Sequence, residues 1–331
     1  MSLELNVITM FLFNVVVYNI SILYGTVGEI ITEKSGSMNL GVEGIMAVGA
    51  IFGYILGCRA DSLLVGILVA FLSSAVCGVL FAVLTVTMHA NQNVTGLTLT
   101  TFGLGLYFFV GKGLGENWPV MNDAVSLKNA LNPIEIPLLK DIPILGKAFF
   151  SHDILVYLGI IIAVVMWWYM KHTKPGLRMR AIGENPAAAD SLGIKINLYK
   201  YIHIMLGAGI MGIGGYYLGL TLGGSFEGSN CWINGYGWIS IALVIFANWS
   251  TSKAILGTLV FGLFNTLQMY NGSLAYAFPR ALGWLTAIPA QLFQALPFIV
   301  TAIVLIINSV KKKKSVNAPS AVGVNYFRED R

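Results

Sequence analysis

A loop between two long apolar stretches organises the chain, and it reads Gly183-Glu184-Asn185-Pro186-Ala187-Ala188-Ala189-Asp190-Ser191-Leu192-Gly193-Ile194. Its residues predict a short helix inside the loop. Asn185 can accept a hydrogen bond from a free backbone N–H of the first turn, and Pro186 suits the first helical position because its missing N–H costs nothing there. The three alanines favour helix, and Gly193 supplies the left-handed residue that ends many helices.

The expected helix has about two turns, or roughly 10 Å at ~1.5 Å per residue. Helices this short are marginal alone in water, so this one needs a surface to pack against. Two interpretations follow from the residues alone. The segment is either a connecting helix that lies on a membrane surface or a docking helix for a soluble partner.

The composition is that of an integral membrane protein. The 331 residues are 56% hydrophobic and 11% charged, whereas soluble chains have about 25% charged residues, and the mean hydropathy is +0.75. The positive charge gathers in two places, which the positive-inside rule puts in the cytoplasm. These are residues 171–200 (Lys171, Lys174, Arg178, Arg180, Lys195, Lys200) and the tail (Lys311, Lys312, Lys313, Lys314, Arg328, Arg331). The net charge of +5 is therefore no sign of a nucleic-acid partner.

The N-terminus and the cysteines add little chemistry. Residues 1–6 are acidic rather than basic, so no cleavable signal peptide is expected. The three cysteines have no metal-ligand spacing. Cys77 lies in an apolar stretch and reads as a core residue. A bridge between Cys58 and Cys231 stays open, because both fall near the expected outer face.

A spanning helix needs about 20 largely apolar residues. We expect about nine spans in one membrane domain over residues 1–310, an all-α polytopic bundle. The spans are 7–26, 40–56, 63–88, 94–110, 154–170, 201–220, 238–247, 254–269 and 288–307, with a polar turn at 28–36. Counting back from the lysine block gives a cytoplasmic loop at 171–200, an external loop at 111–151 and an external N-terminus. The tail, 311–331, is basic, small and polar, and is expected to be disordered.

Small residues recur in the stretch 201–220. Gly215 and Gly219 have GxxxG spacing, and Ala208 with Gly212 is equivalent. Small residues let helix backbones approach closely in lipid. Helix packing is the expected role, with ligand binding as the lesser alternative.

No motif supports an enzyme. The sequence has no P-loop for ATP and no nucleophile elbow, and no cofactor or metal site is predicted in this chain. Polar groups at membrane depth are costly and often mark a pathway. The candidates for a substrate path are Asn39, Glu43, Asn93, Thr98, Asn265 and Gln268. Alternatives stay open, because a threonine can bond its own helix and Glu43 can pair with a neighbouring helix or loop.

Several motifs together resemble the permease subunits of bacterial ABC importers for nucleosides and simple sugars. The resemblance covers roughly residues 24–307. It rests on Gly28-Glu29, Glu33-Lys34-Ser35-Gly36, Asn39-Leu40-Gly41-Val42-Glu43-Gly44, Gly49-Ala50, Asn91-Gln92-Asn93-Val94-Thr95-Gly96, the 183–194 loop, and residues 235–242 ahead of Phe261-Gly262.

The resemblance implies a type II-like importer permease in the bacterial cytoplasmic membrane. Two permeases would sit in lipid, with two ATP-binding subunits that hold ATP-Mg beneath and a substrate-binding protein or lipoprotein outside. Residues 186–192 would be the coupling helix within the segment Gly183 to Gly193. The chain resembles the shorter permease of a nucleoside system, which implies a longer, different second permease. The family's usual count is ten spans.

Two function classes follow. The first is a permease subunit for a nucleoside or related small polar solute, with ribose, galactose and riboflavin-like solutes as alternatives. The second is a stand-alone secondary transporter or channel. A secondary transporter should carry an ionisable pair at mid-membrane, and Glu43 has no evident Lys or Arg partner in the sequence.

Overall fold

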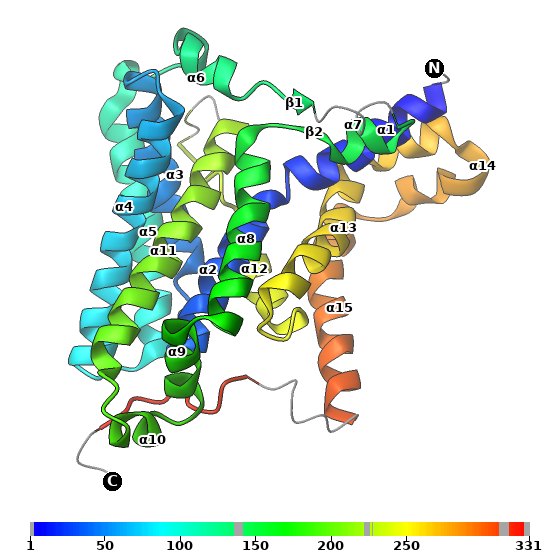
Figure 1. Ribbon diagram of the computed structural model, residues 1–331. Helices are drawn as coiled ribbons and strands as arrows, with labels where there is room; N and C mark the ends of the chain where they lie inside the picture. Colours follow the sequence, from blue (N-terminus) through cyan, green and yellow to red (C-terminus); the bar gives the residue numbers. More distant parts are fainter. Residues whose placement is uncertain (1–2, 136–141, 222–225, 227, 311–317, 328–331) are drawn as a thin grey trace.

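The computed structural model describes residues 3–135, 142–221, 226, 228–310 and 318–327, and this part of the chain is almost wholly helical (Figure 1). The long helices are α1 (Leu3–Val17), α2 (Ile20–Lys34), α3 (Val42–Arg59), α4 (Leu63–Ala82), α5 (Gln92–Leu114), α8 (Ile154–His172), α9 (Lys174–Glu184), α11 (Ile196–Thr221), α12 (Tyr236–Phe246), α13 (Thr251–Ala277) and α15 (Ala290–Val310). The short elements are α6 (Val125–Ala130), β1 (Ile134–Glu135), α7 (Leu145–Phe149), β2 (Ser151–His152), α10 (Pro186–Ser191) and α14 (Pro279–Leu282).

Fewer helices than expected are long and apolar enough to cross a membrane. The described residues contain six such stretches, or seven if the bent pair Pro279–Ala287 and Ala290–Ile306 is one span. The predicted count of about nine is therefore not confirmed. Helix α12 has only 11 residues, too few for a hydrocarbon core of ~30 Å. Helix α13 has 27 residues, but side chains such as Asn265 and Gln268 make it more polar.

The first predicted span is broken in the structure. Helix α1 ends at Val17 and α2 begins at Ile20. Asn19, which is fully buried, lies in the two-residue gap between them. Its Nδ2 donates to the carbonyl of Val15 at 3.0 Å and to Oγ1 of Thr266 at 3.1 Å. A buried amide needs such partners, so the break is anchored to α13.

The polar turn predicted at 28–36 is wrong for most of its length. Helix α2 runs on to Lys34, and Glu29 and Glu33 are buried. Oε1 of Glu29 accepts a hydrogen bond from the backbone N–H of Asn39 at 3.0 Å, and the Glu33 carboxylate accepts one from the Trp249 indole. These partners replace water, so the polar residues remain helical inside the protein.

Helix α11 lies at the centre and packs against α2, α3 and α4. Its small residues make that possible. A Cβ added at Gly49 of α3 would come within 2.5 Å of the Gly212 carbonyl, and one at Gly215 would clash with the Met46 carbonyl. The backbones of α3 and α11 are therefore in direct contact. This confirms the packing role predicted for the glycines of α11.

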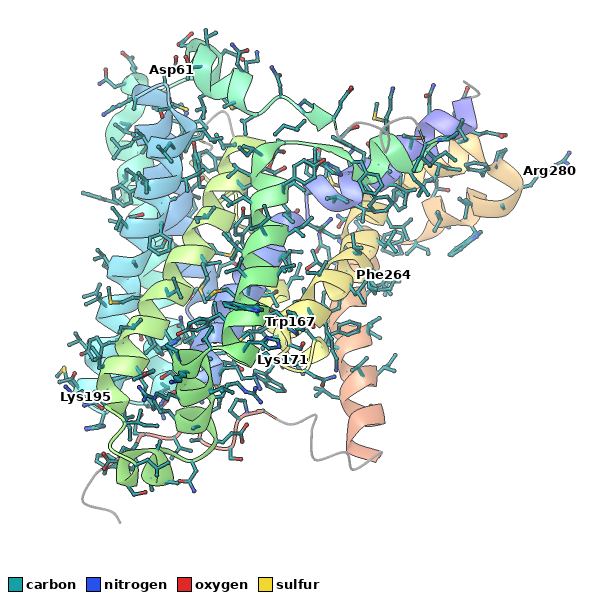
Figure 2. All side chains as sticks on the ribbon, in the orientation of Figure 1. Asp61, Trp167, Lys171, Lys195, Phe264 and Arg280 are labelled. Atoms are coloured by element: carbon teal, nitrogen blue, oxygen red, sulfur yellow. The ribbon has the colours of Figure 1, made fainter. Side chains whose placement is uncertain are left out.

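The loops gather at two opposite ends of the bundle. Helices α6 and α7 and the pair β1–β2 lie at the same end as the start of α1, while α9 and α10 lie at the other (Figure 1). The two strands pair antiparallel, Ile134 opposite His152. Asp61 and Lys195 mark the two ends in Figure 2. The loops predicted at 111–151 and 171–200 are thus on opposite sides.

The turn between α3 and α4 is tied to α6. Asp61 has φ of 45°, and its carboxylate accepts hydrogen bonds from the backbone N–H groups of Leu127 at 2.9 Å and Ser126 at 3.1 Å. These bonds, that of Leu127 first, lower the pKa of the Asp61 carboxyl. Nearby Cys58 is buried and Cys231 is half-buried, and both thiols are free, so the bridge left open above does not form.

Part of the tail differs from the expected disorder. Residues 318–327 lie against α9, α10 and the turn before α5, held by hydrogen bonds described below. Physical contact with specific partners overrides a composition that is polar and poor in large side chains. The lysine block, 311–314, with Arg328 and Arg331, lies outside the described residues.

Candidate functional site

The loop 183–194 folds as its residues predict. Asn185 stands between α9 and α10, and its Oδ1 accepts a hydrogen bond from the Ala188 N–H at 3.0 Å. Pro186 occupies the first turn. The amide cap satisfies one of the free N–H groups of the helix start, so a six-residue helix is held in shape at its N-terminus.

The C-terminal end of α10 is closed just as firmly. Gly193 has φ of +77°, and its N–H donates to the Asp190 carbonyl at 2.8 Å. The Ile194 N–H donates to the Ala189 carbonyl at 3.2 Å. This pair of bonds is the Schellman motif, in which a left-handed residue lets the chain turn back over the last carbonyls. The glycine predicted to end the helix is confirmed.

Helix α10 has one inward and one outward face. Ala189 is 2% exposed and packs with Ile182 and Ile196. Ala187 and Ala188 face outward, and Leu192 at the end of the helix is 80% exposed. The outward face is thus small and apolar, and it ends in one projecting leucine. The sequence predicts only a loop where the structure has helix α9. This helix packs against α10 and holds it at the end of the bundle.

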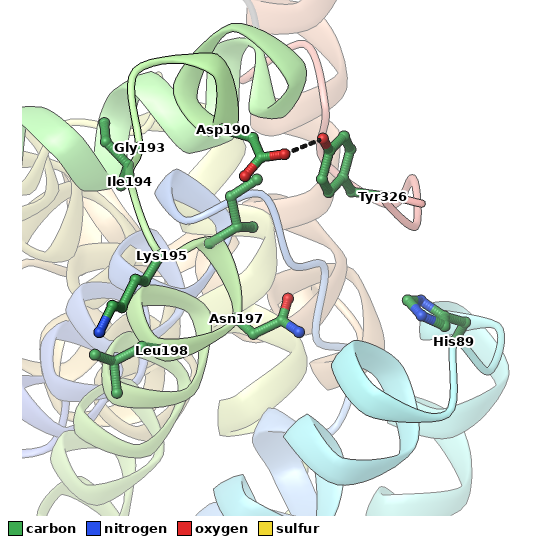
Figure 3. A pocket seen from close by; sticks show the side chains of 9 residues that line it. His89, Asp190, Gly193, Ile194, Lys195, Asn197, Leu198 and Tyr326 are labelled. Atoms are coloured by element: carbon green, nitrogen blue, oxygen red, sulfur yellow. Dashed lines mark hydrogen bonds between the residues drawn. The ribbon is translucent and has the colours of Figure 1, made fainter. Parts of the chain in front are cut away.

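The two carboxylates of this segment meet the tail. Oε2 of Glu184 accepts a hydrogen bond from the Ser320 hydroxyl at 3.3 Å. Oδ2 of Asp190 accepts one from the Tyr326 hydroxyl at 3.1 Å, drawn as the dashed line in Figure 3. Asp190 and Tyr326 line a cavity with a volume of about 460 Å³, and Lys195 and His89 also line it. Lys200, counted among the basic flanks, is instead buried and donates to the Gly36 carbonyl at 3.4 Å.

A second cavity, of about 560 Å³, lies among α12, α13 and α15. Its lining combines side-chain amides with aromatic rings. The amides are Asn234, Asn265, Gln268 and Gln294, and the rings are Tyr236, Trp238, Phe293 and Phe298. Small-molecule pockets commonly measure ~300–1,000 Å³ and combine apolar walls with a few placed polar groups.

Asn265 is fixed in this wall, and Gln268 is not. Nδ2 of Asn265 donates to Oδ1 of Asn19 at 2.8 Å and to the Tyr236 hydroxyl at 3.1 Å. Gln268 lies about one turn further along α13 and has no hydrogen-bond partner among the described residues. The structure therefore brings two of the six candidate path residues to one cavity, one anchored and one with its amide groups available.

The other four candidates lie elsewhere. The Glu43 carboxylate accepts hydrogen bonds from the N–H groups of Gly235 and Gly237 at 2.6 and 2.7 Å, at the start of α12. Oδ1 of Asn39 accepts one from the Gly41 N–H at 2.8 Å. The Thr98 hydroxyl is exposed and donates to its own helix, to the Val94 carbonyl at 2.8 Å. Asn93 is exposed in the first turn of α5.

For Glu43, the alternative of pairing with a neighbouring helix or loop is the one that the structure shows, because its partners are the N-cap and first turn of α12. Its carboxylate lies at a helix start, where free N–H groups and the helix dipole favour a negative charge. The sequence reasoning missed Asn19, Tyr236 and Gln294. Asn19 could have been found as an amide in the middle of an apolar run, but Gln294 has no signal of its own on α15.

The sequence matches a known protein family. The model described as "Branched-chain amino acid transport system / permease component" matches residues 11–306. The chain belongs to this permease family. The permease is similar to three curated proteins along nearly the full length of both chains. No solved structure gives a significant match.

These relatives come from different organisms. The nucleoside ABC transporter permease protein NupC of Lactococcus lactis subsp. cremoris is 31% identical over 98% of each chain. The putative glucose ABC transporter permease protein TsgC13 of Haloferax volcanii is 32% identical, over 93% of this chain and 94% of that protein. The guanosine ABC transporter permease protein NupQ of Bacillus subtilis is 31% identical over 95% of each.

The family decides between the two function classes. This permease is a multi-pass protein of the cytoplasmic membrane and a transport component of an ABC system, in which a separate subunit hydrolyses ATP. ATP-binding subunits and a substrate-binding protein are its partners. A stand-alone secondary transporter or channel is not consistent with this family.

Proposed function

We propose that this permease imports a nucleoside or a related small polar solute, and that the α12–α13–α15 cavity lies on its path. The observation that carries the proposal is the lining of that cavity, which contains both side-chain amides and aromatic rings. A nucleobase has flat π faces and a polar edge. Aromatic rings favour stacked or edge contacts with such faces, and an amide offers both donors and an acceptor to the edge.

A simple sugar is the second candidate. One relative is named as a putative glucose permease, and sugar hydroxyls can also bond to the amides of Gln268 and Gln294. Ribose, galactose and a riboflavin-like solute fit the same chemistry of amides and rings. Binding of guanosine, uridine, glucose, ribose, galactose and riboflavin to the partner binding protein separates these solutes. Guanosine or uridine binding supports the first candidate, and binding of a sugar alone overturns it in favour of the second.

The cavity supports a second permease in the assembly. Trp238 is 38% exposed and Phe298 45% exposed at its edge, so this chain leaves part of the lining uncovered. A second, longer permease packed against α15 would complete the wall. We expect two permeases of different length to co-purify as a heterodimer. A complex that contains two copies of this chain and no second permease would contradict this and indicate a homodimer.

Helix α10 is proposed to dock into an ATP-binding subunit and to transmit its closure. The support is geometric, since α10 is capped at both ends and presents a small outward face with Leu192 at its tip. A capped helix moves as a rigid body, and small side chains fit a groove without steric conflict. The basic flanks, Arg178 and Lys195 among them, favour the cytoplasmic side for this face.

The test compares bulk with charge. Ala188→Trp should abolish co-purification of the ATP-binding subunit or solute uptake, because overpacking a fitted contact costs ~1–3 kcal/mol or more. Asp190→Asn should do less, because the amide oxygen can still accept the hydrogen bond from Tyr326 and a charge pair near the surface contributes only ~0–1 kcal/mol. Both variants should insert normally in the membrane. Normal coupling in Ala188→Trp at normal expression would reduce α10 to a surface connector.

A further inference from the structure

The described part of the tail is attached to the α9–α10 segment at three points. The Ala321 N–H donates to the Gly183 carbonyl at 2.9 Å. Ser320 and Tyr326 donate to the carboxylates of Glu184 and Asp190, and the Tyr326 ring packs with the cluster of Ile182, Ala189 and Ile196. The tail thus holds both the end of α9 and the inner face of α10.

The same ten residues are attached at their other end to the turn before α5. Nδ2 of Asn325 donates to the carbonyls of His89 at 2.6 Å and Ala90 at 3.1 Å. Its Oδ1 accepts from Nε2 of Gln92 at 3.0 Å. Phe327 contacts the His89 ring, with centroids 4.5 Å apart. The Asn325 amide therefore uses both its donor and its acceptor side, which fixes the register of the tail.

Gln92 extends the connection to a third element. It is 3% exposed, lies in the first turn of α5, and its Oε1 accepts a hydrogen bond from the Met38 N–H in the loop between α2 and α3 at 2.7 Å. A chain of bonds therefore runs from α10 through Tyr326, Asn325 and Gln92 to the loop before α3.

The tail runs beside a hollow, and Tyr326 is the tail residue in the lining of that hollow. The cavity of about 460 Å³ is lined by the segment from Asp190 to Leu198 and, across from Lys195 and Leu198, by Tyr326 and His89 (Figure 3). The tail is held by its bonds to α9, to α10 and to the turn before α5. A short segment thus links three elements by hydrogen bonds.

We infer that residues 318–327, here called the strap, are a second coupling element that passes movement of α10 to the start of α5 and to the α2–α3 loop. Tyr326 and Asn325 are its positioning residues. The inference rests on the proposed docking of α10. Its physical basis is that hydrogen bonds with fixed register transmit displacement between packed elements that have more than one arrangement.

The test follows hydrogen exchange in the full transporter complex, with ATP-Mg and vanadate added to trap the nucleotide and without them. In the unmodified permease, trapping should change amide exchange both in α10 and in residues 90–93. In Asn325→Ala, and in a chain that ends at residue 317, the change in α10 should persist while that in 90–93 falls roughly tenfold or more, as expected for losing the three hydrogen bonds of the Asn325 side chain. Val324→Ala is the matched control, because Val324 is 60% exposed beside Asn325; it should behave like the unmodified chain.

The outcomes distinguish the two proposals. If trapping leaves α10 unchanged in the unmodified complex, the proposed docking of α10 fails. If α10 responds and residues 90–93 respond equally in Asn325→Ala and in the shortened chain, the strap transmits nothing and the inference is overturned. Loss of the ATP-binding subunit from the shortened chain would also overturn it, because the tail would then be part of the docking surface.

Discussion

Gly28 and Gly207 lie back to back where α2 crosses α11, so closely that a Cβ on Gly207 would come within 2.5 Å of both the Gly28 carbonyl and the Thr32 hydroxyl. A Cβ on Gly28 would likewise clash with the Gly207 carbonyl. Backbone cannot move aside as a flexible side chain can. This crossing sets the position of α2, whose carboxylates Glu29 and Glu33 then reach their partners in other elements.

We expect Gly207→Ala to destabilise the permease by about 1–3 kcal/mol through overpacking. The midpoint of thermal unfolding in detergent should fall. Gly105→Ala is the control, because a Cβ there meets nothing within 4 Å, and Ala favours helix over Gly. Equal midpoints for both variants would show that the two backbones can separate without cost.

Glu43→Gln should loosen the start of α12. The carboxylate accepts two backbone N–H bonds, and an amide replaces one acceptor with a donor that faces another donor. Bonds to a charged group contribute roughly 1.5–3 kcal/mol, so thermal stability and uptake should both drop. Glu116→Gln, on an exposed side chain, should change neither. Full stability of Glu43→Gln would mean that the anchor is dispensable.

Gln268→Ala should change solute uptake alone, whereas Asn265→Ala should change both uptake and stability. Gln268 lines the cavity and its amide has no hydrogen-bond partner within the described part of the chain, so its loss should raise the KM for uptake at unchanged thermal stability. Asn265 joins Asn19 to Tyr236, and its loss leaves buried groups unpaired at a cost of ~1–3 kcal/mol. We expect lower stability together with lower uptake. Unchanged uptake in both variants would remove the cavity from the path.

Asp61 should tether α6 at neutral pH. The bonds from Leu127 and Ser126 lower the pKa of its carboxyl, so the tether is fully present above the ordinary Asp pKa of ~3.9 and is lost only as the pH falls through the lower folded value. At pH 7, Asp61→Asn should reduce the protection of the Ser126 and Leu127 amides from hydrogen exchange. Protection equal to that of the unmodified chain would contradict the tether.

The positive-inside rule gives an expected sidedness. A cysteine at Leu3, near the external end of α1, should react with an impermeant reagent in intact cells. One at Val316 should react only after the membrane is opened. The two native cysteines in the core, Cys58 and Cys77, are buried and should contribute little background. Labelling of Val316→Cys from outside, with protection of Leu3→Cys, would invert the topology.

Features set by neighbouring residues were predictable. The caps of α10 depend on Asn185, Pro186 and Gly193, all within one loop, and the structure has each in the expected place. The close contacts of α11 also follow from the spacing of its glycines. One loop contains all the residues that decide the caps of α10. For α11 the short stretch supplies one side of each close contact, and Gly28 of α2 and Gly49 of α3 supply the other.

Features that depend on residues far apart in the sequence could not be predicted. The break at Asn19 needs Thr266 on α13, and the helical state of 28–34 needs Asn39 and Trp249 to receive its carboxylates. Of the candidate path residues, only Asn265 and Gln268 reach the cavity, because its other walls come from α12 and α15. Polarity alone does not say which side of a helix will meet which neighbour.

The docked tail also bears on how the protein can be handled. A purification tag or fluorescent reporter joined directly after Phe327 would begin beside His89, next to Tyr326, which is bonded to Asp190 of α10. Such a fusion would crowd the face on which the partner ATPase is proposed to sit. The N-terminus lies at the opposite end of the bundle (Figure 1), which makes it the better point of attachment for any label used in assembly or transport assays.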